Sequence, residues 1–129
     1  MADLCFLLDT NMLIYLLGGL SEQLRNRVEQ YPPGSIGTSM LCVAEAVYGI
    51  RDDEAARHAL SRLLQIIEPI PFDLPAAWRF AEVPFRRGRL DRLIAAHALA
   101  LDLTLVTNNE ADFIDVPALK MENWVADNG

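Results

Sequence analysis

The chain has 129 residues, of which 52% are hydrophobic and only two are cysteine, so it suits one compact core without a disulfide scaffold, and we expect a single domain over residues 1–129. Its formal net charge of -7 at pH 7 excludes a general attraction to nucleic acid, so a nucleic-acid partner would need a local basic patch or a bound metal. No apolar stretch approaches the ~20 residues of a membrane span and no signal-peptide pattern opens the chain, so we expect a cytoplasmic protein without membrane contacts.

Short apolar runs alternate with helical patterns along the first half of the chain. Residues 4–8 predict a strand buried on both faces, and the helix that follows ends at about residue 17, before two glycines. A second helix begins after Ser21, and a very short strand is centred on Ile36. Further helices are predicted over residues 40–50 and 53–65.

The second half continues this alternation. Residues 66–71 contain two prolines and predict an edge strand. A helix over 74–83 ends before a proline, and the most apolar helix of the chain spans about 90–101. Residues 103–106 predict another strand, followed by a helical turn near 110–113 and a small strand near 119–121. This pattern predicts an α/β fold, a three-layer sandwich in which helices flank a short, mainly parallel central sheet.

Polar side chains follow two of the predicted strands. Asp9, Thr10 and Asn11 come directly after the first strand, and Thr107, Asn108 and Asn109 come after the strand at 103–106. The carboxyl ends of parallel strands share one edge of a sheet, where α/β proteins bind ligands. Asp9 has apolar sequence on both sides, so its carboxylate needs a partner.

Three more acids are candidates for the same edge, and each also has a structural interpretation. Glu45 has mostly apolar neighbours on its helix and is expected on a buried face, where Tyr48 or an arginine could satisfy it. Asp91 precedes the most apolar helix and could simply cap it. Asp112, on the helical turn, could be an ordinary exposed carboxylate. Taken together, these oxygen donors, without histidine or cysteine among them, favour Mg²⁺ or Mn²⁺.

Four motifs, in this order and at these spacings, resemble the PIN-domain ribonucleases, and most closely the VapC-type toxins of bacterial toxin-antitoxin pairs. The first three are Leu7–Asn11, Ser39–Glu45 and Asp91–Ala98, and the fourth runs from Leu105 through Asn109 to Phe113. The resemblance covers nearly the whole chain, as far as the Met-Glu-Asn-Trp sequence at 121–124.

The resemblance implies a metal-dependent endoribonuclease that hydrolyses RNA phosphodiester bonds and acts as the toxin of a type II toxin-antitoxin system. By this resemblance, Asp9, Glu45 and Asp91 match the first three acids of a pocket that binds Mg²⁺ or Mn²⁺. Either Asp112 or Asn109 completes the site, so a triad or a quartet, and one metal or two, remain open. Asp9 and Asp91 would hold the metal, and Glu45 would hold it or position the attacking water. Four further residues are expected to contact and orient these ligands without being the main metal ligands themselves. They are Thr10, Asn11, Thr107 and Asn109.

Five of the ten arginines lie within fourteen residues that lead into the helix at 90–101. They are Arg79, Arg86, Arg87, Arg89 and Arg92. Guanidinium groups suit phosphate recognition, so we expect Arg86, Arg87, Arg89 and Arg92 to contact RNA, although pairing with the chain's own carboxylates would also explain them.

The resemblance also implies protein partners. These are a cognate antitoxin that covers the acidic pocket, and a second copy of the chain in a homodimer, with a heterotetramer or larger assembly formed with the antitoxin. Operator DNA would then be contacted only through the antitoxin. The RNA target, the cleavage site and the dimer surface stay open.

Other classes fit the sequence less well. A phosphatase of the haloacid dehalogenase type would need a second acid where Asn11 stands, and a receiver domain would need a lysine after a late strand, whereas the only lysine is Lys120. The remaining alternative is a non-catalytic PIN-like module that binds protein or RNA without cutting, because asparagines stand where many relatives carry a fourth acid.

Overall fold

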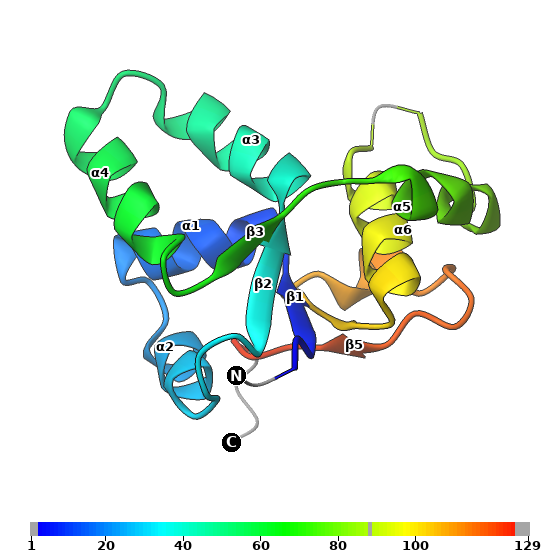
Figure 1. Cartoon of the computed structure of the whole chain (residues 1–129), viewed down its shortest axis with the longest axis horizontal. Helices are drawn as coiled ribbons and strands as arrows, with labels where there is room; N and C mark the ends of the chain where they lie inside the picture. The colour runs from blue at the N-terminus through cyan, green and yellow to red at the C-terminus, as the bar shows by residue number, and fades with distance from the viewer. Residues whose placement is uncertain (1–2, 88, 126–129) are drawn as a thin grey trace.

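A computed structural model of the chain describes residues 3–87 and 89–125, and these residues form a five-stranded sheet (Figure 1). The strands are β1 (Phe6–Leu8), β2 (Ile36–Ser39), β3 (Glu68–Ile70), β4 (Thr104–Val106) and β5 (Met121–Glu122). Their order across the sheet is β3-β2-β1-β4-β5, and every neighbouring pair is parallel. The predicted α/β class and parallel sheet are confirmed.

The order of the strands reverses at the central strand β1. The chain adds β2 and β3 on one side of β1 and later adds β4 and β5 on the other side. In the register of the sheet, Phe6 lies opposite Ile36 on one side and opposite Thr104 on the other. Because connections diverge from such a strand, its carboxyl end opens into a crevice, which is where open α/β sheets bind ligands.

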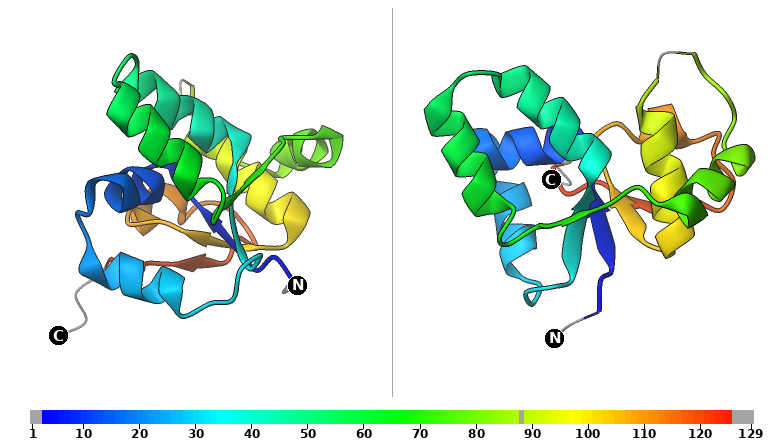
Figure 2. Two further views of the ribbon diagram at one scale, coloured as in Figure 1. Left: turned by 60° about the vertical axis from the view of Figure 1, so that its left-hand side comes forward. Right: turned by 45° about the horizontal axis from the view of Figure 1, so that its top comes forward.

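Helices cover both faces of the sheet. They are α1 (Thr10–Gly18), α2 (Glu22–Glu29), α3 (Met40–Ile50), α4 (Glu54–Leu63), α5 (Leu74–Arg79) and α6 (Asp91–Leu101). In both views of Figure 2, α1 to α4 lie on one side of the sheet and α5 and α6 on the other. This arrangement gives the three layers expected from the sequence. None of the helices among the described residues is long and apolar enough to cross a membrane.

Local sequence explains where most helices begin and end. Asp9 caps α1 and Ser21 caps α2, each by accepting a hydrogen bond from a backbone N–H of the first turn. Gly19 ends α1 in the left-handed conformation at φ 61°, which suits a residue without a Cβ. The predicted strand at 66–71 is shorter than expected but does lie at the sheet edge, as β3.

One predicted helix is divided. The sequence predicted a continuous helix over 74–83, whereas α5 ends at Arg79 and a tighter 3-10 turn, η1 (Phe80–Glu82), follows. Pro84 disfavours helical geometry in the residue before it, so the chain leaves the helix early through a 3-10 turn. The prediction of one domain over residues 1–129 stays a prediction.

The core lies on both sides of the sheet, against α6 on one face and against α1 to α4 on the other. Leu7 and Leu8 of β1 are fully buried, and so are Ala95, Ala96 and Ala98 of α6. Small alanines let this helix approach the sheet closely, and its buried length fixes the position of the residue at its start, Asp91.

Candidate active site

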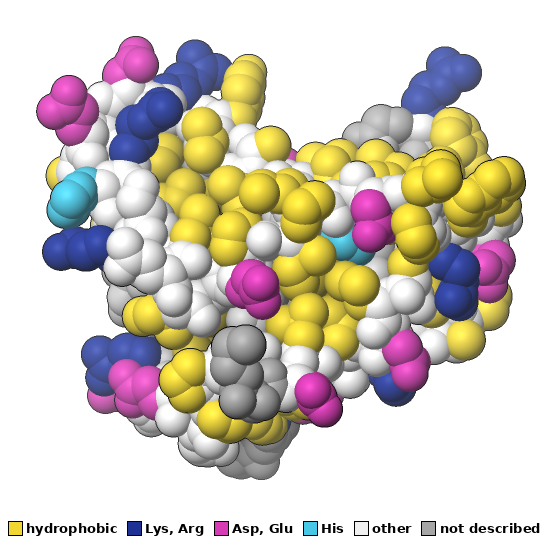
Figure 3. All heavy atoms as spheres, in the orientation of Figure 1, with side chains coloured by type: hydrophobic (Ala, Val, Ile, Leu, Met, Phe, Trp, Pro, Cys, Tyr) yellow, Lys and Arg dark blue, Asp and Glu magenta, His cyan; other side chains and the backbone are white. Residues whose placement is uncertain are grey.

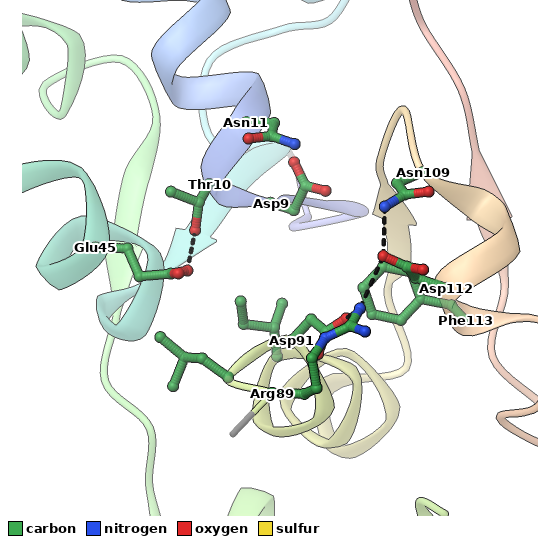
Figure 4. A pocket seen from close by; sticks show the side chains of 11 residues that line it. Asp9, Thr10, Asn11, Glu45, Arg89, Asp91, Asn109, Asp112 and Phe113 are labelled. Carbon is green, nitrogen blue, oxygen red and sulfur yellow. Dashed lines mark hydrogen bonds and ion pairs between the residues drawn. The ribbon is translucent and has the colours of Figure 1, made fainter. Parts of the chain in front are cut away.

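A pocket of about 280 Å³ opens at the carboxyl ends of β1 and β4 (Figure 4). All four predicted acids line it. They are Asp9, Glu45, Asp91 and Asp112. They come from the end of β1, from α3, from the start of α6 and from the 3-10 turn η2 (Glu110–Phe113). The structure therefore brings together four acids that are separated by up to about a hundred residues of sequence; whether they act in catalysis stays a prediction.

Asp9 is the most buried of these acids. It follows β1 directly, its backbone N–H donates to the Val106 carbonyl of β4, and its Oδ1 accepts from the Met12 N–H at 3.1 Å. Burial raises the pKa of Asp9, and hydrogen bonds from the Thr107 hydroxyl and the Met12 N–H only partly offset this effect. A nearby Glu45 raises the pKa further. This carboxylate is thus in an environment that a cation would stabilise.

Glu45 lies on a different face of its helix from the one expected. The sequence predicted a buried apolar face, but Glu45 is exposed and Tyr48 beside it is 71% exposed. Cys42 and Ala46 form the buried face of α3 instead. The partner of Glu45 is neither Tyr48 nor an arginine: Thr10 Oγ1 donates to Glu45 Oε1 at 2.5 Å, so the carboxylate points into the pocket.

Asp91 and Asp112 are held together by an arginine. Arg89 Nη2 donates to Asp91 Oδ2 at 2.6 Å and to Asp112 Oδ2 at 2.8 Å. Asp91 stands in the first turn of α6, but the residue before it, Leu90, takes the cap position, and α6 has no side-chain cap. The capping interpretation of Asp91 is therefore wrong, and its carboxylate is turned toward the pocket.

The predicted supporting residues divide into two groups. Thr10, Asn11 and Asn109 line the pocket, and Asn109 Nδ2 donates to Asp112 Oδ2. Thr107 is fully buried beneath the pocket and accepts a hydrogen bond from the Asn109 N–H. Asn108, which was expected at the same edge of the sheet but not as a supporting residue, accepts from Asn11 Nδ2 and donates to the Tyr15 hydroxyl. The Thr-Asn-Asn sequence after β4 was the available signal.

Arg92 lies in the interior rather than in an RNA-binding patch. Only 1% of its side chain is exposed. It donates to both carboxylate oxygens of Asp115, at 3.1 and 3.2 Å, and to the backbone carbonyl of Asp112. The prediction that Arg92 contacts RNA is therefore wrong, because a guanidinium engaged in this way cannot reach a phosphate. Asp115 was not among the predicted site residues; it lies 23 residues away, and no local pattern in the sequence connects it to Arg92.

The other arginines of this segment are closer to the surface. Arg86 and Arg87 are exposed, and Arg86 Nη2 lies 3.1 Å from Asp115 Oδ2. The positive charges of the segment are thus partly balanced by the chain's own carboxylates, which was the alternative interpretation. RNA contacts by Arg86, Arg87 and Arg89 stay a prediction.

The chemistry of the pocket suits a divalent metal, although its side chains need to rearrange to share one. In residues 3–87 and 89–125, no group of three or more His, Cys, Asp or Glu side chains is placed to hold a metal ion. Asp91 Oδ1 is buried and accepts no hydrogen bond among the described residues; it lies 3.9 Å from Arg92 Nε, beyond hydrogen-bond distance, so this oxygen can still accept a ligand. Cys42 does not compete as a donor, because burial raises its pKa to about 12 and keeps the thiol neutral.

Comparison with known proteins shows similarity over almost the full length of the chain. A family model described as "PIN domain" matches residues 6–119. The chain is 31% identical to Ribonuclease VapC2 of Rickettsia felis, over 92% of this chain and 97% of that protein. It is 27% identical to the tRNA(fMet)-specific endonuclease VapC of Salmonella typhimurium, over the same shares of the two proteins.

Solved structures show the same similarity. The crystal structure of VapBC2 from Rickettsia felis, bound to a DNA fragment from their promoter, matches with a TM-score of 0.84 and 30% sequence identity, covering 94% of this chain and 99% of that chain. The crystal structure of DNA-bound VapBC from Salmonella typhimurium matches with a TM-score of 0.80 and 27% identity, covering 94% of this chain and 98% of that chain.

Proposed function

This chain belongs to the PIN-domain family, among the VapC-type ribonucleases, and we propose that its acidic pocket hydrolyses RNA phosphodiester bonds with the help of Mg²⁺ or Mn²⁺. The observation that carries the proposal is the convergence of Asp9, Glu45, Asp91 and Asp112 on one pocket at the point where the strand order reverses. In this role the chain is the toxin of a type II toxin-antitoxin pair.

The donor set supports the metal. Carboxylate and amide oxygens are the ligands that Mg²⁺ and Mn²⁺ prefer, and four carboxylates in one pocket repel one another unless a cation offsets their charge. A bound divalent cation supplies positive charge to the carboxylates and to the phosphate that is cleaved.

The surroundings of each acid suggest its role. Asp9 is buried and fixed by the Met12 N–H, and Asp91 has a buried oxygen that accepts no hydrogen bond among the described residues, so these two would hold the metal. Glu45 is more exposed and is oriented by the Thr10 hydroxyl, which suits a carboxylate that accepts a proton from the attacking water. Asp112, fixed by Asn109, would complete the set.

The first test is an RNA cleavage assay with Asp9→Asn. We expect the rate of Mn²⁺-dependent cleavage to fall by about 100-fold or more. Losses of this size are typical when one group that stabilises charge in the transition state is removed. Asparagine retains the side-chain oxygen that caps α1, so the circular dichroism spectrum and melting curve should still show a folded protein.

A matched control removes the same charge elsewhere. Asp52→Asn changes an exposed residue between α3 and α4 and should cleave like the unaltered chain. The substrate to try first is tRNA(fMet), because relatives from Salmonella typhimurium and Shigella flexneri are named for it. Cleavage that survives both Asp9→Asn and chelation by EDTA would refute the proposed chemistry.

A non-catalytic module is the second candidate, and two observations favour it. Asn109 brings no charge to the fourth position, and Arg89 already neutralises part of the pocket. If the folded chain binds RNA but never cleaves it with Mn²⁺ present, this alternative replaces the first.

The partners proposed for this chain follow its relatives. The VapBC structures hold two kinds of chain on DNA, so we propose an antitoxin that covers the pocket, a homodimer of this chain, and operator contacts made through the antitoxin. Figure 3 shows hydrophobic side chains gathered across the face between α3 and α5. Tyr48 of α3 and Trp78 of α5 are each more than two-thirds exposed, and exposed apolar surface of this kind supports a protein partner.

A further inference from the structure

The guanidinium of Arg89 lies inside the acidic pocket, between carboxylates from two separate segments of the chain. It donates to Asp91 Oδ2 at 2.6 Å and to Asp112 Oδ2 at 2.8 Å (Figure 4). Asp91 opens α6 and Asp112 belongs to η2, so a single side chain joins two elements at the pocket wall.

Arg89 is also the only cationic side chain among the described residues that line this pocket, and four carboxylates line the same pocket. The hydrogen bond to Asp91 and the charges of Asp91 and Asp112 raise the pKa of Arg89, so the guanidinium stays charged. A divalent cation that binds both Asp91 and Asp112 would have to occupy the place where the Arg89 guanidinium lies.

We propose that Arg89 is the internal counter-cation of the metal-free pocket, and that a divalent metal binds in competition with it. This inference rests on the proposed metal site. When the metal enters, the guanidinium leaves Asp91 Oδ2 and Asp112 Oδ2, and these oxygens become available together with Asp91 Oδ1, which accepts no hydrogen bond among the described residues and lies 3.9 Å from Arg92 Nε.

The contacts of Arg89 are weak enough to exchange. Its side chain is 38% exposed, and ion pairs at such positions are weakened by water and salt. Asp112 does not lose its position when Arg89 leaves, because Asn109 Nδ2 also donates to it. Asp91 is fixed by its place in the first turn of the buried helix α6.

Direct measurement of Mn²⁺ binding tests the competition. Isothermal titration of the purified chain with MnCl₂ should give a roughly fivefold to tenfold lower Kd for Arg89→Gln than for the unaltered chain, since the variant lacks both ion pairs and the repulsive charge. Arg87→Gln removes the same charge two positions away, from an exposed residue that does not line the pocket, and should leave the Mn²⁺ Kd unchanged.

Thermal unfolding without metal gives a second readout. Arg89→Gln should melt at a lower temperature than the unaltered chain in EDTA, because Asp91 and Asp112 then lose the guanidinium that joins them, and saturating Mn²⁺ should remove this difference.

The possible results separate this inference from the proposed function. An equal or weaker Mn²⁺ affinity in Arg89→Gln overturns the competition while leaving the metal site intact, since it would mean that Arg89 is neutral or helps to hold the ligands. If neither chain binds Mn²⁺, the proposed metal site itself fails and the competition fails with it. Tighter binding in Arg89→Gln alone, with Arg87→Gln unchanged, supports both.

Discussion

Asp9 has a structural role, and the proposed metal site would give the same side chain a second role as a ligand. Its Oδ1 caps α1 through the Met12 N–H, which fixes the carboxylate at the end of the central strand. Burial raises its pKa, so the folded protein without metal holds a carboxylate in an unfavourable place. Such an arrangement is typical of functional sites, where stability is lowered for the sake of ligand binding.

His97 is a buried residue whose environment, by contrast, suits the neutral form. Its Nδ1 lies 2.9 Å from Ser39 Oγ, and its ring meets the edge of Phe72. Burial lowers the pKa of His97, and the charge of nearby Asp73 only partly offsets this effect. The contact with Ser39, which caps α3, joins α6 to the start of that helix.

This environment predicts how stability depends on pH. The folded state keeps His97 neutral, whereas the unfolded chain takes up a proton below the usual histidine pKa of about 6.5, so the contribution of His97 to stability is lost as the pH falls. A single group limits the slope to about 1.4 kcal/mol per pH unit. In urea unfolding between pH 8 and 5, His97→Gln should show a flatter pH dependence than the unaltered chain.

The exposed His58 supplies the control for that measurement, because His58→Gln should leave the slope unchanged. A steep slope that persists in His97→Gln would show that other groups, not this imidazole, set the pH dependence.

Among the elements, α6 and η2 are joined by a buried arginine. Arg92 of α6 reaches Asp115 just beyond η2 and the backbone carbonyl of Asp112 within it. Burial acts to raise the pKa of Asp115, but the hydrogen bond from Arg92 and the charges of Arg92 and Arg86 outweigh it, so the pKa lies below its ordinary value. The position of the Asp112 side chain at the pocket thus depends on the contacts of Arg92 with Asp115 and with the backbone of η2.

Removing this contact should loosen the turn. Arg92→Ala deletes a fully buried side chain with its hydrogen bonds, and we expect the free energy of unfolding to fall by about 2–4 kcal/mol, measured in urea. Asp115→Asn should also lower the melting temperature.

A surface ion pair serves as the comparison for Arg92. Lys120 and Asp102 lie 3.2 Å apart with exposed side chains, so Lys120→Ala should change stability by less than about 0.5 kcal/mol. Equal effects from Arg92→Ala and Lys120→Ala would contradict the structural role assigned to the buried pair.

At the scale of the whole molecule, an acidic protein that binds RNA needs a local group of positive charges on its surface. The net charge of -7 disfavours phosphate, and part of that charge lies in the pocket. Arg86 and Arg87 remain exposed on the segment that leads to Asp91. We expect these two guanidinium groups to contact the phosphates of an RNA strand that passes over the acidic site, while the proposed metal offsets the charge inside it.

The salt dependence of RNA binding tests this arrangement. In an Asp9→Asn background, which prevents cleavage, Arg86→Ala combined with Arg87→Ala should weaken binding and reduce the slope of log Kd against log salt by about one to one and a half units, as two lost phosphate contacts imply. Arg57→Ala combined with Arg62→Ala removes the same charge from α4, which does not line the pocket, and should leave the slope nearly unchanged. Identical slopes in all three proteins would exclude RNA contacts by Arg86 and Arg87.

The sequence by itself determined the layout of this protein and the identity of its acids. Hydrophobic runs and helical periodicity are local, so they predicted strands near residues 4–8 and 103–106 and the buried helix that α6 became. A parallel sheet places the ends of its strands at one edge, so Asp9 could be expected near the residues that follow β4. Four acidic residues, without histidine or cysteine among them, then indicated a binding site for Mg²⁺ or Mn²⁺.

Only the tertiary structure decided which charges meet. Glu45 turned out exposed and bonded to Thr10, because α3 buries Cys42 and Ala46 instead. Arg89 entered the pocket, whereas Arg92, three residues later, was buried against Asp115. Neighbouring residues share the same local pattern, but the partner of each charge depends on packing between segments that are far apart in the chain, so two arginines three residues apart have different partners.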